Sequence, residues 1–111
     1  MAGLTEQNLE QMIQVIVNAV NPEQIILFGS QATGASRQGS DIDLLIIESD
    51  PFGEKRSRRK EMARLWRALA SFPFPKDILV YSRDEVEFWR HSLNNVVAKA
   101  LREGKVLYER S

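Results

Sequence analysis

Two carboxylates, one residue apart at the head of an apolar strand, constrain the fold of this chain more than any other feature. The stretch "LFGSQATGASRQGSDIDLLII" (27–47) starts apolar, passes through small and polar residues, and presents Asp41 and Asp43 before a second apolar run. Because side chains alternate between the faces of a strand, both carboxylates point the same way, with Cα atoms roughly 7 Å apart. Ile42 and Leu44 point the other way, into a core. The stretch therefore predicts a strand with one buried face and one face that collects negative charge.

The rest of the chain alternates helix and strand patterns. Helices are expected over 9–20, 54–70 and 93–101, where apolar residues recur at helical spacing. Short β-rich runs over 25–28, 41–48 and 77–81 predict strands, and a terminal strand could span 106–108. Capping signals support these bounds at Thr5, at Asn21-Pro22, at a capping box of Ser82 and Glu85, and at Gly104. This order of elements predicts one small α/β layer structure.

Length and composition suit a single domain that spans 1–111. Of the 111 residues, 43% are hydrophobic and 27% are charged, and the formal net charge is zero. A neutral chain does not favour direct binding to nucleic acid or to an anionic membrane. The absence of cysteine excludes disulfides and thiolate chemistry, and it agrees with a cytoplasmic location. We find no signal-peptide pattern and no apolar run of membrane-spanning length.

A third carboxylate and a glycine turn complete a candidate site. Asp77 opens the third strand as Asp41 opens the second, so adjacent strands would bring three carboxylates to one end of the sheet. Paired carboxylates repel each other unless a cation lies between them, and oxygen ligands suit Mg²⁺ and Mn²⁺. Gly29 lets the backbone approach a ligand closely, and Ser30 could cap a helix whose N–H groups face a phosphate. Together these features predict phosphoryl or nucleotidyl transfer with two metal ions.

Each of these signals is weak when taken alone. An Asp-x-Asp at a strand end is often only solvated, and a Gly-Ser pair is usually only a turn. The joint pattern is much more specific: strand, Gly-Ser, ten residues, Asp-x-Asp, strand, and a further strand that carries Asp.

The joint pattern resembles the minimal nucleotidyltransferases (MNT) of the DNA polymerase β superfamily. The matching residues lie at 28–30 ("FGS"), 40–45 ("SDIDLL") and 77–80 ("DILV"), and the C-terminal "ALREGKVLYER" is similar as well. The resemblance implies an α/β (α+β) fold with a small mixed sheet of three to four strands and helices packed on one face. It also implies two Mg²⁺ ions, with Mn²⁺ as an alternative, bound by Asp41, Asp43 and Asp77.

The resemblance further implies ATP as the substrate and AMP transfer to a hydroxyl acceptor, with Asp77 helping to deprotonate that hydroxyl. The implied nucleotide-binding residues are Gly29, Ser30, Gln31 and Ser40. Gln31 stands where many relatives carry arginine directly after Gly-Ser. It can hydrogen-bond a phosphate, but without the charge-assisted strength of arginine, for which Arg37 in the same loop could substitute.

Proteins of this size resemble the antitoxin half of HEPN–MNT toxin–antitoxin pairs. This resemblance implies a HEPN ribonuclease encoded nearby as the partner and one of its tyrosines as the acceptor, in a homo- or hetero-oligomer. RNA 3′ ends or a small molecule are alternative acceptors, although no added domain for either is evident. A second hypothesis is a non-catalytic antitoxin that inhibits its partner by occlusion. The presence of Asp41, Asp43, Asp77 and Ser30 favours the enzyme.

Three further features have structural interpretations. The basic stretch "EKRSRRK" (54–60) is expected to be a solvated helix face rather than a polyanion site. Trp66 falls on an apolar stripe and is expected in the core. Phe88 and Trp89 are adjacent and cannot both point inward from one helix, so one of them is a candidate for a protein interface.

Overall fold

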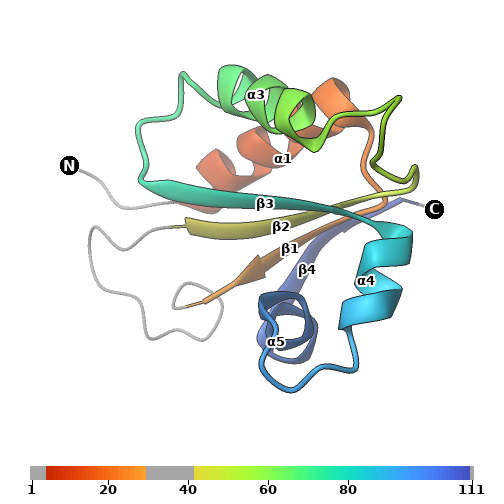
Figure 1. Ribbon diagram of the computed structural model, residues 1–111. Coiled ribbons are helices and arrows are strands. Elements are labelled where there is room, and N and C mark those ends of the chain that lie inside the picture. The colour runs from red at the N-terminus through yellow and green to blue at the C-terminus, as the bar shows by residue number, and fades with distance from the viewer. Residues whose placement is uncertain (1–4, 30–41, 111) are drawn as a thin grey trace.

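A mixed sheet with helices on both faces forms the framework of the molecule (Figure 1). The computed structural model describes residues 5–29 and 42–110. The strands are β1 (Gln24–Phe28), β2 (Ile42–Glu48), β3 (Lys76–Ser82) and β4 (Lys105–Glu109), and the helices are α1 (Glu6–Val20), α3 (Arg58–Ala68), α4 (Arg83–Trp89) and α5 (Val96–Glu103). The four-stranded sheet has the order β3-β2-β1-β4. β2 and β3 run parallel, and β1 is antiparallel to both β2 and β4. The predicted α/β fold and the terminal strand are confirmed.

The caps of α1 lie where the sequence predicts them. The Thr5 hydroxyl accepts a hydrogen bond from the Asn8 N–H at 3.1 Å. At the other end Asn21 adopts a left-handed conformation with φ of 46°, and its N–H donates to the Val17 carbonyl. Asparagine tolerates this conformation better than most residues, and Pro22 then prevents the helix from continuing.

The next helix begins later than expected. The apolar pattern predicts a helix from about residue 54, but α3 starts at Arg58. The reason is local: Gly53 and Arg56 form an isolated antiparallel bridge, with N–H to carbonyl distances of 2.9 and 3.2 Å. That bridge occupies the backbone groups a helix would need. Ser57 then caps α3 by accepting a hydrogen bond from the Lys60 N–H at 3.3 Å.

The segment after β3 forms two helices. The predicted capping box is present, and the Ser82 N–H donates to Glu85 Oε1 at 2.9 Å at the start of α4. The expected helix over 93–101 begins only at Val96, because the Asn95 side chain caps it by accepting from the Val97 N–H at 2.8 Å. Gly104 ends α5 as predicted, and its tight packing requires glycine, since a Cβ there would lie 2.3 Å from a backbone oxygen.

Each face of the sheet has its own core. On one face α1 and α3 pack against side chains such as Ile25, Leu44 and Ile78. On the other, α4 and α5 contribute Val86 and Val97 to a second core. The expectation of helices on one face thus describes α1 and α3 only. The two short helices cover part of the second face (Figure 1).

The basic stretch at 54–60 ties α3 to the sheet, so the interpretation as a solvated face is wrong for two of its arginines. Arg56 donates a hydrogen bond to the buried carboxyl group of Glu48 and forms an ion pair with Glu61 at 3.3 Å. Arg58 pairs with Glu85, and its Nη1 donates to the Val80 carbonyl at 2.6 Å on edge strand β3. A guanidinium on a free edge carbonyl also protects that edge from pairing with another chain.

Candidate functional site

Asp43 and Asp77 lie side by side on adjacent parallel strands. In the register of β2 and β3 the two residues are direct partners. Neighbouring strands lie about 4.8 Å apart, and side chains at matched positions of a parallel pair point to the same face. Asp43 is half-buried and Asp77 is exposed. Their strands are therefore neighbours, which was the condition for the predicted site. The structure brings together two of the three predicted carboxylates.

This carboxylate pair lies on the face of the sheet that α1 and α3 leave uncovered. Alternation places Asp43 on the same side as Leu45, and Asp77 on the same side as Leu79; both leucines belong to the second core. The pair lies at the second residue of β2 and of β3, whereas α4 follows the last residue of β3. Among the described helices, α4 and α5 are the two that pack on this face (Figure 1).

Gly29 brings the backbone against the carboxylate of Asp43. The register partner of Asp43 in β1 is Phe28, and Gly29 follows it with φ of +74°. A Cβ at Gly29 would lie 2.3 Å from Asp43 Oδ2, so a side chain there would require the Asp43 carboxylate to move. Glycine is therefore favoured twice, by its left-handed backbone and by this contact. The backbone thus lies close to one of the predicted metal-binding carboxylates.

A lysine that the sequence analysis did not single out fixes the start of β3. Lys76 Nζ donates to the carbonyls of Phe72 and Phe74 at 2.8 and 3.1 Å. The Ile42 N–H donates to the Pro75 carbonyl at 2.9 Å, which ties the starts of β2 and β3 together. The sequence does contain a signal for this role of Lys76, namely the preceding "SFPFP" connection. Its two prolines have no N–H to donate, so carbonyl groups in this connection need another hydrogen-bond donor.

Lys76 also lies over the ring of Trp66, 5.9 Å from its centroid. Trp66 itself is 41% exposed, so its predicted place in the core is wrong. Its apolar body packs at the surface of α3, where the cation of Lys76 can lie against the ring.

The remaining predicted site residues lie outside the described residues. These are Ser30, Gln31, Ser40 and Asp41. Within 5–29 and 42–110 no group of three or more His, Cys, Asp or Glu side chains is placed to hold a metal. The donor set that is described still fits a hard divalent cation, because Mg²⁺ in proteins usually takes one or two carboxylates and completes its shell with water and phosphate.

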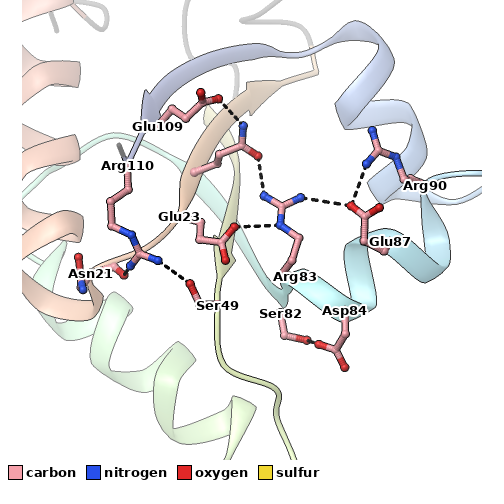
Figure 2. Close-up of polar contacts among 11 residues, drawn as sticks. Asn21, Glu23, Ser49, Ser82, Arg83, Asp84, Glu87, Arg90, Glu109 and Arg110 are labelled. Carbon is pink, nitrogen blue, oxygen red and sulfur yellow. Dashed lines mark hydrogen bonds and ion pairs between the residues drawn. The ribbon is translucent and has the colours of Figure 1, made fainter.

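A polar hollow at the other end of the sheet offers no comparable chemistry. It has a volume of about 350 Å³ and is lined by Glu23, Gln24, Arg83, Glu109 and Arg110. These side chains largely satisfy one another: Arg83 donates to Glu23 and Gln24, and Gln24 donates to Glu109 (Figure 2). We therefore assign this hollow a structural role and place the candidate site at the carboxylate pair.

Comparisons with known proteins agree with the geometry. The family described as "Polymerase beta, Nucleotidyltransferase" matches residues 10–111. A comparison with curated proteins finds no match.

In the described part of the chain, no helix has both the length and the apolar character that crossing a membrane requires.

Several solved structures share the fold. A toxin–antitoxin complex with AMP-PNP aligns at 22% identity with a TM-score of 0.60, covering 94% of this chain and 75% of that one. A putative nucleotidyltransferase from Sulfolobus solfataricus aligns at 18% identity with a TM-score of 0.62, covering 92% and 78%. A mutant of the toxin–antitoxin pair MntA-HpeT aligns at 19% identity with a TM-score of 0.54, covering 94% and 74%. At these identities the likeness concerns the fold.

Proposed function

This chain belongs to the polymerase beta nucleotidyltransferase family, and from that premise we propose that it transfers AMP from ATP to a hydroxyl group of a protein, with Mg²⁺ as cofactor. The observation that carries the proposal is the register pairing of Asp43 with Asp77, with Gly29 packed against Asp43. Two carboxylates at one end of a sheet, beside a turn where the left-handed backbone favours glycine, are what a metal–nucleotide site needs.

The proposed ligands of two Mg²⁺ ions are Asp41, Asp43 and Asp77, with Mn²⁺ as an alternative. When bound, the ions would supply positive charge to the phosphate and to the attacking and leaving oxygens. The role of the chain is to hold its carboxylates at fixed spacing. The β2–β3 ladder does so for Asp43 and Asp77 through backbone hydrogen bonds.

The other residues of the site would bind and orient the substrates. For the triphosphate we propose binding by Gly29, Ser30, Gln31 and Ser40 through backbone and side-chain hydrogen bonds. The acceptor hydroxyl attacks the α-phosphorus, and pyrophosphate leaves. We propose that Asp77 accepts the proton of the incoming hydroxyl, and its greater exposure compared with Asp43 supports this role.

For the acceptor we propose a tyrosine of a HEPN toxin encoded nearby, which would make this chain an antitoxin that acts by AMPylation. The support is indirect: structures with the same fold come from toxin–antitoxin complexes, one of them with AMP-PNP. The chain is expected to act in the cytoplasm, where such a partner and ATP are both present.

The test uses the protein encoded beside this one. The two are incubated with Mg²⁺ and each of the four nucleoside triphosphates, and added mass on the neighbour is measured by intact mass spectrometry. We expect addition of AMP from ATP, lost in Asp43→Asn and in Asp77→Asn. Asp50→Asn is the matched control, because Asp50 is an exposed aspartate beyond the opposite end of β2.

Failure of transfer with every triphosphate would contradict the proposal. If the two proteins then still formed a complex that inhibited the neighbour, occlusion would be the mechanism. Transfer to RNA or to a small hydroxyl compound in place of the neighbour would support nucleotidyl transfer but contradict the proposed protein acceptor.

A further inference from the structure

Exposed apolar side chains gather on α4, α5 and the connection between them. Phe88 and Leu93 are 74% and 83% exposed, and Trp89 and Val96 are each 38% exposed. We call these four residues the α4–α5 ridge. Because they are adjacent on one helix, either Phe88 or Trp89 was expected at the surface, and both are there. Exposed apolar residues are ordinary when scattered, but a cluster of large ones marks an interaction surface.

The α4 part of the ridge is preorganised. The rings of Phe88 and Trp89 pack edge to face, with centroids 4.9 Å apart and planes at 90°. At the start of α4, Arg83 donates to Glu23 at 2.9 Å and to Gln24 at 3.0 Å, which fastens the helix to β1 (Figure 2). A surface that is already ordered loses little entropy when a partner binds, and aromatic side chains are enriched at such interfaces.

The charges around the ridge favour a protein as its occupant. The segment 83–103 carries four basic and four acidic side chains, so its formal charge is zero. Arg90 pairs with Glu87 at 2.8 Å, and Arg83 lies 3.5 Å from the same carboxylate. Nucleic acids and anionic membranes are bound through an excess of basic side chains, which this segment lacks. An apolar centre with a neutral, internally paired rim is the anatomy of a protein–protein interface.

The ridge and the carboxylate pair share one face of the sheet. α5 runs from Val96 in the ridge to Leu101, roughly 7.5 Å further along the helix axis. Leu101 and Phe28 belong to the same core, and Phe28 is the register partner of Asp43. A protein that covers about 800 Å² per partner, the usual size of a stable interface, can therefore contact the ridge and the carboxylates at once.

We infer that the α4–α5 ridge docks the acceptor protein and orients its hydroxyl toward Asp43 and Asp77. The inference rests on the proposed function, since it assigns the surface that selects the acceptor. The proposed occupant of the ridge is a folded protein with a complementary apolar surface. A second copy of this chain seated on the ridge would compete with the acceptor for the same face of the sheet.

The test compares two variants with the wild-type chain. In Phe88→Ser/Leu93→Ser the two most exposed side chains of the ridge are replaced, and a melting curve checks that the fold is kept. Trp66→Ser is the control, because it removes an aromatic side chain that is 41% exposed on α3, on the opposite face of the sheet. The affinity for the protein encoded nearby is measured by calorimetry, and nucleotide binding is measured separately with Mg²⁺ and AMP-PNP.

We expect the ridge variant to bind the neighbour at least about tenfold more weakly, because apolar anchors at interface centres carry most of the affinity. The control should stay within about twofold of wild type, and all three proteins should bind AMP-PNP equally. Equal affinity of wild type and ridge variant for the neighbour, or no binding by wild type, would overturn the inference. A variant that loses only self-association would overturn it in favour of a second copy.

These outcomes separate the inference from the proposed function. If the ridge variant no longer binds the neighbour and wild type transfers no AMP, the docking surface is supported and the proposed nucleotidyl transfer is contradicted. If wild type transfers AMP and the ridge variant does so with equal affinity and rate, nucleotidyl transfer is supported and the docking surface fails.

Discussion

At the scale of single residues, Gly29 has the most stringent requirement. Its φ of +74° costs an alanine about 1–2 kcal/mol, and a side chain there would collide with Asp43 Oδ2. We predict that Gly29→Ala destabilises the fold by about 2 kcal/mol and lowers nucleotidyl transfer further than the lost stability explains, because Asp43 must move. Urea unfolding and transfer assays measure the two effects.

Gly53→Ala is the control for that substitution. A Cβ at Gly53 meets no atom within 4 Å, and its φ is not in the left-handed region. The free energy of unfolding should therefore change by less than about 0.5 kcal/mol. Equal effects of the two substitutions would show that the contact of Gly29 with Asp43 is unimportant.

A second residue-scale prediction concerns Glu48, which is 2% exposed. Burial, with the neighbouring Glu61 carboxylate, raises the pKa of Glu48 to about 8, against the opposing effect of Arg56. The folded state thus retains a proton that the unfolded chain releases near pH 4.5. The associated stability is complete below pH 4.5 and is lost as pH rises toward and through 8.

We therefore expect the free energy of unfolding to fall by at least about 1 kcal/mol between pH 5 and pH 8, because a pKa shift of even one unit is equivalent to about 1.4 kcal/mol. In Glu48→Gln, which carries no ionisable group, this fall should be reduced. Urea unfolding at a series of pH values measures both curves. A Glu48→Gln curve parallel to that of wild type would rule out Glu48 as the source.

At the scale of elements, the connection between α3 and β3 controls where Asp77 lies. Lys76 donates to two carbonyls of that connection, at Phe72 and Phe74. Hydrogen bonds from a charged group contribute about 1.5–3 kcal/mol. We predict that Lys76→Met destabilises the chain by about 2 kcal/mol in urea unfolding.

The same substitution should lower nucleotidyl transfer, because the residue that precedes Asp77 loses its anchor. Lys55→Met serves as the control, since Lys55 is an exposed lysine before α3 and should be replaceable within about 0.5 kcal/mol. Wild-type stability in Lys76→Met would show that the two hydrogen bonds do not hold this connection.

Elements whose ends are set by local chemistry could be predicted from the sequence. Thr5 and the pair of Ser82 and Glu85 satisfy backbone groups within three residues of themselves, so their patterns are readable without a fold. The start of α3 could not be predicted, because the bridge between Gly53 and Arg56 competes with the helix and has no strong signature. The exposure of Trp66 depends on how α3 rotates against the sheet, which helical spacing alone does not determine.

At the scale of the whole molecule, the two faces of the sheet differ in their use. One face packs against α1 and α3. The other is shared between the carboxylate pair and the two short helices, so that face is where a substrate and a partner protein would meet (Figure 1). The sequence predicted that Asp41, Asp43 and Asp77 meet at one end of the sheet on condition that β2 and β3 are neighbours, and of these the described residues Asp43 and Asp77 pair in register. It could not supply that adjacency, which is a long-range property of the strand order.

The central claim is that Asp43 and Asp77 act as one metal–nucleotide site. The most direct measurement is the affinity for AMP-PNP in the presence of Mg²⁺, determined by calorimetry for wild type, Asp43→Asn, Asp77→Asn and the double variant. If both carboxylates hold the same metal–nucleotide complex, each single variant should lose most of the affinity and the double variant should lose little more. Losses that add up independently, or affinities that match wild type, would contradict the account.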